Sequence, residues 1–194
     1  MKLAEAFEIL RRVRQKTGHR DLVVIGSNAS LAFAKTGALP AEMTMSTDLG
    51  CYTKDDPGRI FDVVGELGEG SPFHKKIGYY LDAVSPHLPA LPDGWEARML
   101  RETSDGDSLW FIDPNDAAIS KYARGEPRDR RWIQAGLVAG IVSLPRVRIL
   151  AGHTSFLDKT ETAAVFRRID EDAAWLASRP RESPLPTAGP RSKP

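Results

Sequence analysis

Seven residues in four separate stretches are of the types that bind phosphate groups and divalent cations. Glycine and serine let a backbone approach phosphate oxygens, carboxylates bind Mg²⁺, and lysine or arginine neutralises phosphate charge. The seven residues are Gly26, Ser27, Asp48, Asp82, Lys121, Arg128 and Asp129. Each stretch also has a simpler structural explanation.

Gly26 and Ser27 follow a run of four apolar residues, 22–25, that is typical of a short buried strand. Gly26 would let the backbone approach a ligand, and Ser27 would donate to a phosphate oxygen. The helix expected next would offer unpaired N–H groups. Gly26 and Ser27 could also simply form a strand-to-helix turn, which needs a small residue. Taken alone, the two residues favour this structural explanation over a phosphate site.

Asp48 and Asp82 each stand inside an otherwise apolar or aromatic run. A carboxylate is costly to bury unless it is paired or binds a metal ion, and alternation along a strand puts Asp48 and Gly50 on one face. Two acids at neighbouring strand ends could bind Mg²⁺, which takes one or two carboxylates plus substrate phosphates. The alternative is that each acid emerges at a strand end and caps a loop N–H, and the residues support it equally well.

Lys121 lies in a predicted helix over residues 113–124, and a basic run follows it. A lysine buried against the sheet could contact phosphates, with Asp129 orienting either Lys121 or Arg128. A run of charge such as residues 124–131 is more often the solvated face of a helix–helix junction. The bare residues favour that interpretation.

Other residue types narrow the classes of function. The four histidines are widely scattered, and Cys51 has no histidine beside it in the sequence. Lys and Arg number 27 against 26 Asp and Glu, so the net charge of +1 does not select nucleic acid as a partner. The single cysteine excludes an intramolecular disulfide framework and favours a reducing compartment. No apolar run approaches the roughly 20 residues that span a membrane, so we expect a cytoplasmic protein without a membrane partner.

Periodicity along the 194 residues predicts an α/β (α+β) fold in which a strand-rich part precedes a helical part. Strands are expected at residues 22–25, 45–52 and 77–84, followed by a hairpin of residues 95–100 and 109–112. Helices are expected at residues 3–18, 28–35, 57–67, 113–124, 128–144 and 160–178. The expected parts are a sheet domain over 1–112, a helical part packed on it over 113–178, and a disordered tail over 179–194.

The order of these motifs resembles a known superfamily. Gly26-Ser27, then the acid in Ser-Thr-Asp-Leu at 46–49, then an acid in the third strand, resembles the nucleotidyltransferase fold of the polymerase β superfamily. Residues 111–121 read Phe-Ile-Asp-Pro-Asn-Asp-Ala-Ala-Ile-Ser-Lys and are followed by Arg128-Asp129. They resemble the late motif of AbiEii-type and MenT-type toxin nucleotidyltransferases. The resemblance covers about residues 22–144.

This resemblance implies a nucleotidyltransferase-like mixed sheet flanked by helices, with a C-terminal helical part. It implies in-line attack of a hydroxyl on the α-phosphate of a nucleoside triphosphate (NTP), with pyrophosphate leaving. The acceptor would be an RNA, for example a tRNA 3′ end, or a protein. A cognate antitoxin would be a further partner.

The resemblance also implies roles for the seven residues. Asp48 and Asp82 would bind Mg²⁺, and Asp82 would serve as third carboxylate or as base. Lys121 and Asp129 would complete the catalytic set. The triphosphate would be held by Gly26, Ser27 and Arg128.

Gly50 departs from the family pattern. The metal motif of the family is acid-apolar-acid, whereas this chain has Asp48-Leu49-Gly50. Either Gly50 is an inactivating change, native or introduced, or Asp48 and Asp82 hold a single ion. We expect a weakened or inactive transferase site.

Two other functions fit the same residues. One is a non-catalytic module on this fold that binds RNA or protein through the arginine-rich segment. The other is a small-molecule transferase, for example one that modifies an antibiotic.

Overall fold

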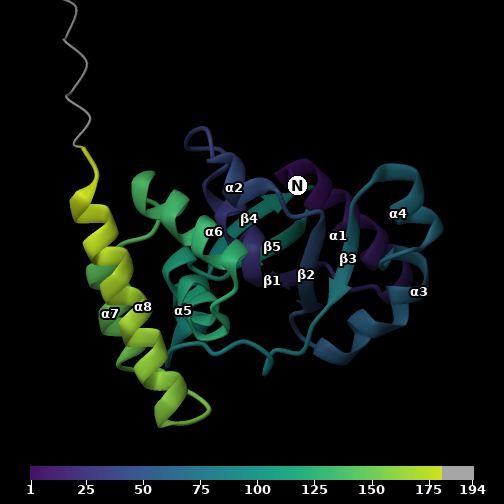
Figure 1. Cartoon of the computed structure of the whole chain (residues 1–194). Helices are drawn as coiled ribbons and strands as arrows, with labels where there is room; N and C mark the ends of the chain where they lie inside the picture. The colour runs from purple at the N-terminus through teal and green to yellow at the C-terminus, as the bar shows by residue number, and fades with distance from the viewer. Residues whose placement is uncertain (181–194) are drawn as a thin grey trace, which may run out of the picture.

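A mixed sheet of five strands forms the centre of the molecule (Figure 1), and the computed structural model describes residues 1–180. The strand order is β3-β2-β1-β5-β4, in which β1 pairs with β5 and β2 with β3 in parallel, and the other two pairs are antiparallel. The strands are β1 Asp21–Val24, β2 Asp48–Thr53, β3 Tyr80–Ala83, β4 Leu100–Ser104 and β5 Asp107–Phe111. The predicted α/β (α+β) class, a mixed sheet flanked by helices with a C-terminal helical part, is confirmed.

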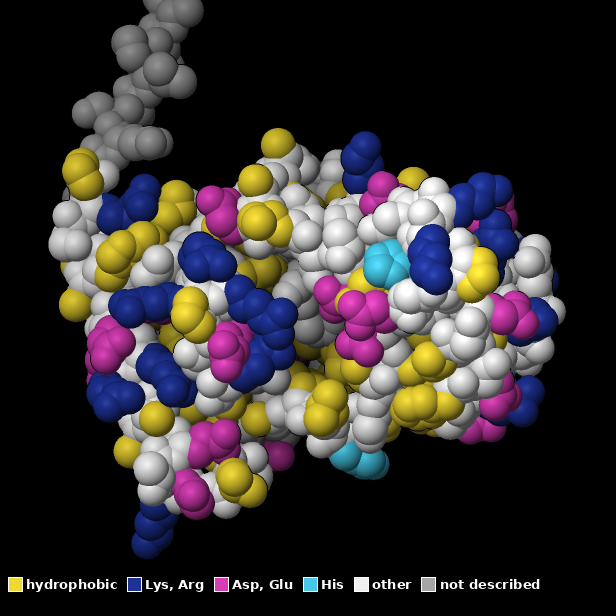
Figure 2. Space-filling view, turned by 45° about the vertical axis from the view of Figure 1, so that its right-hand side comes forward, with side chains coloured by type: hydrophobic (Ala, Val, Ile, Leu, Met, Phe, Trp, Pro, Cys, Tyr) yellow, Lys and Arg dark blue, Asp and Glu magenta, His cyan; other side chains and the backbone are white. Residues whose placement is uncertain are grey.

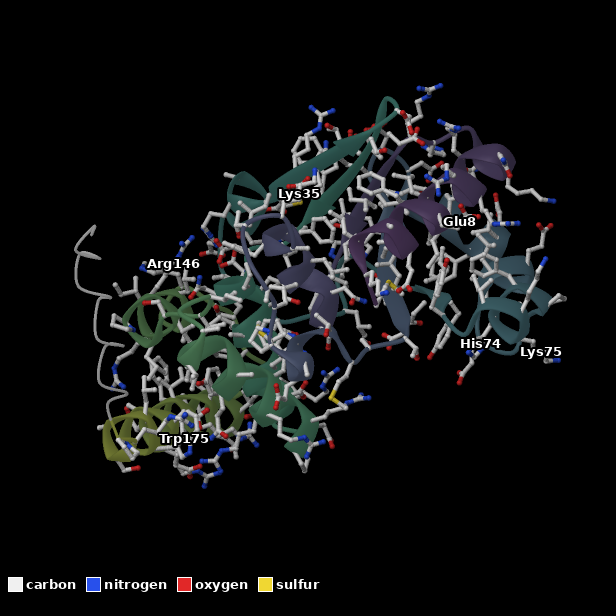
Figure 3. All side chains as sticks on the ribbon, turned by 90° about the horizontal axis from the view of Figure 1, so that it is seen from above. Glu8, Lys35, His74, Lys75, Arg146 and Trp175 are labelled. Carbon is white, nitrogen blue, oxygen red and sulfur yellow. The ribbon has the colours of Figure 1, made fainter. Side chains whose placement is uncertain are left out.

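Helices flank the sheet on two sides. In Figure 1, α5 to α8 gather at one side of the sheet and α3 and α4 at the other, and Figure 3 shows Trp175 and His74 at opposite ends of the molecule. The α-helices are α1 Leu3–Thr17, α2 Ala41–Thr44, α3 Val64–Leu67, α4 Pro72–Ile77, α5 Pro114–Arg124, α6 Pro127–Val138, α7 Leu144–Ala151 and α8 Lys159–Ser178. The 3₁₀ helices are η1 Gly26–Phe33, η2 Pro57–Val63 and η3 Trp95–Arg98. Within residues 1–180, no helix is long and apolar enough to cross a membrane.

The strand directions bring distant segments to one edge of the sheet. Because β1 and β5 run parallel, with Val24 beside Phe111, both end at the same edge. Strand β2 runs antiparallel to β1 and therefore begins at that edge, and β3 begins there too because it is parallel to β2. The turn after β1, the start of α5 and the first residues of β2 and β3 therefore meet.

Helix α5 forms where the sequence predicts it. The Asp113 side chain caps the helix by accepting a hydrogen bond from the N–H of Asn115 at 2.8 Å, and Pro114 occupies the first turn. Gly125 ends the helix in the left-handed conformation, with φ 72°. Ala117, Ala118 and Ile119 are buried, so one face of α5 packs into the core.

Several expected elements are different in the structure. The helix expected at 57–67 is a 3₁₀ helix, η2, over residues 57–63, and only residues 64–67 form an α-helix, α3. Residues 26–33 form a 3₁₀ helix rather than an α-helix, since their small side chains give η1 no apolar stripe. The strand expected at 77–84 is shorter, because Ser71 caps a short helix, α4, that Gly78 ends at φ 80°. The first strand of the expected hairpin is also displaced, because residues 95–98 form η3 and β4 begins only at Leu100.

The helix expected at 128–144 is wrong at its end. Helix α6 ends at Val138, and a turn with Gly140 at φ 70° separates it from α7. Pro145 lies in the first turn of α7, so this proline begins a helix where the sequence suggested that it stops one. The helix expected at 160–178 is confirmed as α8. Of the tail expected at 179–194, residues 181–194 lie outside the described residues.

Candidate active site

A cavity of about 990 Å³ lies between this edge of the sheet and helices α5 and α6. All seven residues singled out in the sequence line it, although they come from β2, β3, α5, α6 and the turn after β1. Gly50 lines the same cavity. Figure 2 shows a hollow in the surface with Lys and Arg side chains on one side and Asp and Glu side chains on the other.

Asp48 and Asp82 form the acidic wall. Asp82 lies beside Gly50 in the parallel pairing of β2 and β3, so Asp48, Gly50 and Asp82 share one face of the sheet. The Ser46 hydroxyl donates to Asp48 Oδ1 at 2.5 Å, and the Asn28 amide donates to the Asp48 carbonyl at 2.5 Å. Burial, and then the nearby charges of Asp48 and Glu69, raise the pKa of Asp82. The two carboxylates therefore repel each other across a site that favours a cation.

Nothing in the backbone requires glycine at position 50. A Cβ atom there would lie 3.4 Å from the Ile25 carbonyl oxygen and 3.9 Å from Ile25 Cγ1, which are ordinary contacts. The Gly50 carbonyl accepts a hydrogen bond from the Ile25 N–H at 2.9 Å, which a side chain would leave in place. A Cβ atom at this position would fit, and the side chain of an aspartate there would extend from the face that carries Asp48 and Asp82.

Lys121 is the centre of the basic wall. Its side chain is 3% exposed, and its ammonium donates to Ser27 Oγ at 2.9 Å and to Asp129 Oδ1 at 3.3 Å. The ammonium also lies 4.7 Å from the centre of the Trp132 ring. Burial lowers the pKa of Lys121 to about 8, although Asp129 opposes that shift. A buried lysine held against a hydroxyl is well placed to meet a phosphate group.

Asp129 fixes two cations at once. It is 1% exposed and, besides Lys121, accepts hydrogen bonds from Arg124 Nε at 2.7 Å and from the Arg124 Nη2 atom at 2.5 Å. Burial alone would raise the pKa of Asp129, but the hydrogen bond from Arg124 and the charge of Lys121 hold it below its ordinary value. The sequence left open whether Asp129 orients Lys121 or Arg128. In the structure the Asp129 carboxylate contacts Lys121 and Arg124.

Arg128 and Arg131 are left free by this arrangement. Both are exposed at the start of α6 and line the cavity, and within residues 1–180 neither has a carboxylate at ion-pair distance, unlike Arg124 and Arg130. Arg128 lies in the first turn of α6 and meets the positive end of the helix dipole, so its charge does not favour folding. A bound anion would compensate both charges.

The turn after β1 is fixed by two helices. Gly26 adopts φ 78°, a left-handed conformation that favours glycine. The Ser27 carbonyl accepts a hydrogen bond from the Trp132 indole at 2.9 Å, while its hydroxyl accepts from Lys121. Since Lys121 is the donor, the Ser27 hydroxyl keeps its own proton to give to a ligand oxygen.

The donor set suits a metal ion that arrives with a phosphorylated substrate. Among residues 1–180, no group of three or more His, Cys, Asp or Glu side chains is arranged to hold a metal ion. Mg²⁺ requires less, because one or two carboxylates suffice when substrate phosphates supply further oxygen ligands. Asp48 and Asp82, with their mutual repulsion, fit that requirement.

Sequence reasoning missed part of the site. Arg124 and Arg131 stood in the basic run without assigned roles, and Trp132 was expected only on the buried side of its helix. Asn28 and Ser46 act through hydrogen bonds to Asp48 that no spacing could indicate. A usable signal existed only for Arg124, which follows Lys121 by one helical turn.

Comparison with known proteins gives one match. The family model described as "Nucleotidyltransferase of unknown function (DUF6036)" matches residues 1–175. No curated protein matches the chain, and no solved structure does.

Proposed function

Since this chain belongs to that nucleotidyltransferase family, we propose that it transfers a nucleoside monophosphate from an NTP to an acceptor hydroxyl. One observation carries the proposal: carboxylates and buried or unpaired cations face each other across a single cavity (Figure 2). Opposite charges on facing walls suit a triphosphate with Mg²⁺, because the cations meet phosphate oxygens and the carboxylates meet the metal ion.

The basic wall binds the triphosphate. The Ser27 hydroxyl donates to a phosphate oxygen, and Lys121, already held by Asp129, adds a charged donor beside it. Arg128 extends the same wall with a free guanidinium. The buried position of Lys121 excludes water from this contact and strengthens it.

The acidic wall serves the reacting centre. A Mg²⁺ ion held by Asp48 and Asp82 would neutralise charge that develops on the phosphates. The acceptor oxygen bonds to the α-phosphorus, the bond from this phosphorus to its bridging oxygen breaks, and pyrophosphate leaves with that electron pair. In the form of the mechanism in which Asp82 is the base and not an ion ligand, the hydroxyl proton passes to its carboxylate.

Gly50 weakens this activity. With Gly50 in place, the face that carries Asp48 and Asp82 has two carboxylates where the related pattern has three. The present sequence therefore binds the nucleotide and transfers it slowly or not at all. Binding without transfer would make the chain a non-catalytic nucleotide-binding module, which is the second candidate function that Gly50 favours.

A toxin of a toxin–antitoxin pair is the finer form of the proposal. It rests on the resemblance of residues 111–121 and of Arg128-Asp129 to the AbiEii-type and MenT-type motif. In this form the acceptor is a macromolecule, either an RNA such as the 3′ end of a tRNA or a protein, and a cognate antitoxin restrains the activity.

The test compares the present chain with its Gly50→Asp variant, with α-³²P-labelled NTPs, Mg²⁺ and a cell lysate as the source of acceptors. We expect label to be transferred by Gly50→Asp, much less by the present chain, and not at all by Gly50→Asp combined with Asp48→Asn. Equilibrium binding of each NTP is measured alongside. If Gly50→Asp binds NTP but transfers no label, the non-catalytic nucleotide-binding module is the function that remains. If it neither binds NTP nor transfers label, the proposal is overturned.

A further inference from the structure

The mouth of the cavity carries three unusually exposed aliphatic side chains. Met45 is 71% exposed, Leu88 is 73% exposed and Leu157 is 89% exposed, and all three line the cavity. They come from three separate connections, before β2, after β3 and before α8. These three residues are called the aliphatic rim below, and they line the same cavity as Asp82.

The aliphatic rim has no evident role in folding. Leu157 stands just before Asp158, the N-cap of α8, where an apolar residue often packs back on the helix, yet it extends into solvent. Leu88 belongs to a turn closed by its own N–H and the Ser85 carbonyl at 3.1 Å. Single exposed apolar side chains are common on protein surfaces, but three that line one cavity mouth form a patch, and such a patch indicates contact with another molecule.

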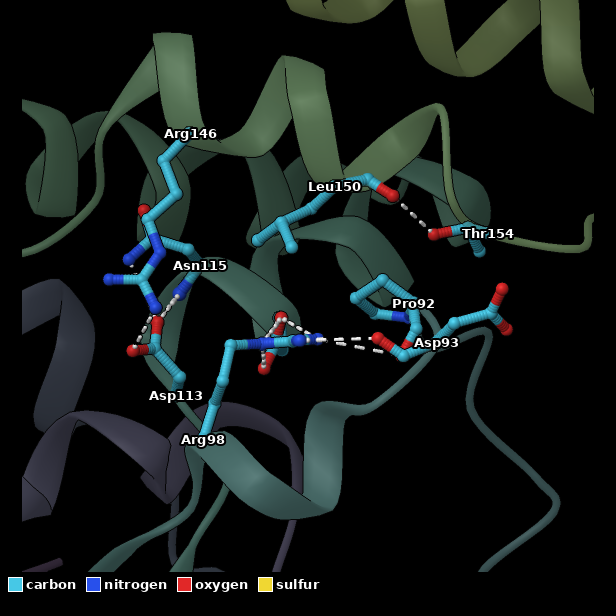
Figure 4. A network of polar contacts seen from close by, with 9 residues as sticks. Pro92, Asp93, Arg98, Asp113, Asn115, Arg146, Leu150 and Thr154 are labelled. Atoms are coloured by element: carbon cyan, nitrogen blue, oxygen red, sulfur yellow. Dashed lines mark hydrogen bonds and ion pairs between the residues drawn. The ribbon is translucent and has the colours of Figure 1, made fainter.

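The two connections that carry Leu88 and Leu157 are held together. Pro92 pairs with Thr154, and the Asp93 N–H donates to the His153 carbonyl at 2.9 Å. Figure 4 shows Arg98 reaching the carbonyls of Pro92 and Asp93, and its guanidinium also binds the buried Asp116 carboxylate. The connections that carry Leu88 and Leu157 are therefore tied to each other, which lowers the entropy cost of docking on them.

The charges at the mouth are of both signs. Arg128 and Arg131 stand on one side, while Glu42 and Glu161 also line the cavity. Single-stranded RNA is usually held by stacking on exposed aromatic rings and by a continuous basic groove. Within residues 1–180, Phe61 is the aromatic among the highly exposed large apolar side chains, and it does not line the cavity. Of the described residues, the rings that do line the cavity are the buried Trp132, the half-buried Phe156 and the exposed His87, which come from separate segments and form no continuous stacking surface. Aliphatic contacts with arginine and mixed charge are instead typical of protein interfaces.

We propose that the acceptor is a protein, which docks on the aliphatic rim through a segment with aliphatic side chains and charges of both signs. This segment presents a Ser, Thr or Tyr hydroxyl to the cavity. The inference rests on the proposed transferase function. The hydroxyl oxygen bonds to the α-phosphorus, pyrophosphate leaves with the electron pair of the broken bond, and the product is a protein–nucleoside monophosphate diester. Carboxylates of the partner would face Arg131, and its basic groups would face Glu42.

The experiment changes two of the three residues of the aliphatic rim in the Gly50→Asp background, and this double substitution is called the aliphatic-rim variant. Leu88→Ser with Leu157→Ser is compared with a matched control, Val138→Ser with Ile149→Ser, whose residues are 52% and 65% exposed and do not line the cavity. Label from α-³²P-NTP is measured in the protein and RNA fractions of a cell lysate, with and without ribonuclease. Equilibrium NTP binding is measured for every variant.

We expect Gly50→Asp to label protein and this label to resist ribonuclease. The aliphatic-rim variant should label protein about tenfold less or weaker still, whereas the control variant should stay within about twofold of Gly50→Asp. All variants should bind NTP equally. Label confined to RNA, or protein label that the aliphatic-rim variant keeps, would overturn the protein acceptor and leave the transferase function standing. NTP bound by Gly50→Asp with no label in either fraction would overturn the transferase function, and this inference with it.

Discussion

The ammonium of Lys121 lies 2.9 Å from the hydroxyl of Ser27, although 94 positions separate them in the chain. The contact joins helix α5 to the turn after β1 and closes one corner of the cavity. It requires a charged group to stay buried, since Lys121 is 3% exposed. Burying the Lys121 charge therefore lowers the stability of the fold, and in return a cation is available to bind a phosphate group.

Replacing Lys121 by methionine separates binding from stability. Lys121→Met keeps the length of the side chain and removes the charge, so we expect NTP affinity to fall by roughly 10- to 100-fold, the worth of a charged hydrogen bond. The pKa of about 8 against an ordinary 10.5 means that the buried charge costs on the order of 3 kcal/mol at neutral pH. The thermal midpoint should therefore not fall, because Arg124 still pairs with Asp129.

The control for this change is Lys159→Met, at an exposed lysine that begins α8. It should alter neither NTP affinity nor the thermal midpoint. Binding is measured by titration with NTP and Mg²⁺, and stability by circular dichroism on heating. A Lys121→Met protein that unfolds at a clearly lower temperature would contradict the assignment of Lys121 to ligand binding rather than to the fold.

The pH dependence of binding and of stability should run in opposite directions. Above about pH 8 Lys121 loses its proton in the folded chain, whereas in the unfolded chain it keeps the proton up to about pH 10.5. Because the unfolded chain then binds more protons, the free energy of unfolding rises with pH over this range. Neutral Lys121 no longer attracts phosphate, so NTP affinity should fall over the same range. Measurements between pH 7 and about 9.5 on the native chain and on Lys121→Met test this, since the variant should lack both dependences.

Restoring a carboxylate at position 50 should be visible without any assay of activity. Gly50→Asp places a third acid on the face that carries Asp48 and Asp82, and the Cβ position has room for it. Repulsion among the three should lower the thermal midpoint in a chelator by a few degrees, and Mg²⁺ should restore it. Gly50→Asn, of the same size without the charge, is the control. Equal midpoints with and without Mg²⁺ for Gly50→Asp would count against a metal site here.

Local patterns in the sequence were sufficient to place Asp48 and Gly50 toward the cavity. Alternation along a strand depends on neighbouring residues alone, so it predicts a shared face without knowledge of the fold. Pro145 shows the limit of such rules, because proline suits both the residue after one helix and the first turn of the next.

Contacts between distant residues could not be predicted in this way. Trp132 donates to the Ser27 carbonyl across 105 positions. Arg124 rather than Arg128 pairs with Asp129, across the short connection between α5 and α6. Both contacts depend on how the helices pack on the sheet. The sequence therefore predicted which residue types line the site, and the packing decided which of them touch.

The basic wall also depends on α8, through Asp172. This carboxylate is 1% exposed and accepts hydrogen bonds from the Tyr122 hydroxyl at 3.1 Å, from Arg130 at 3.2 Å and from Gln134 at 2.9 Å. The three donors lie on α5 and α6, so Asp172 ties both helices of the basic wall to α8. Burial, and then the charge of Asp172, raise the pKa of Tyr122, which keeps that hydroxyl a donor.

We expect Asp172→Ala to lower the free energy of unfolding by about 1–3 kcal/mol, because it leaves the buried Tyr122 hydroxyl without an acceptor and removes the contacts to Arg130 and Gln134. The control is Asp170→Asn on the same helix, whose carboxylate is 59% exposed and pairs with Arg148, and it should cost less than about 1 kcal/mol. Urea unfolding followed by circular dichroism measures both. Equal destabilisation by the two changes would mean that Asp172 does not hold the basic wall in place. In that case the NTP affinity of Asp172→Ala, measured well below its unfolding midpoint, should equal that of the native chain.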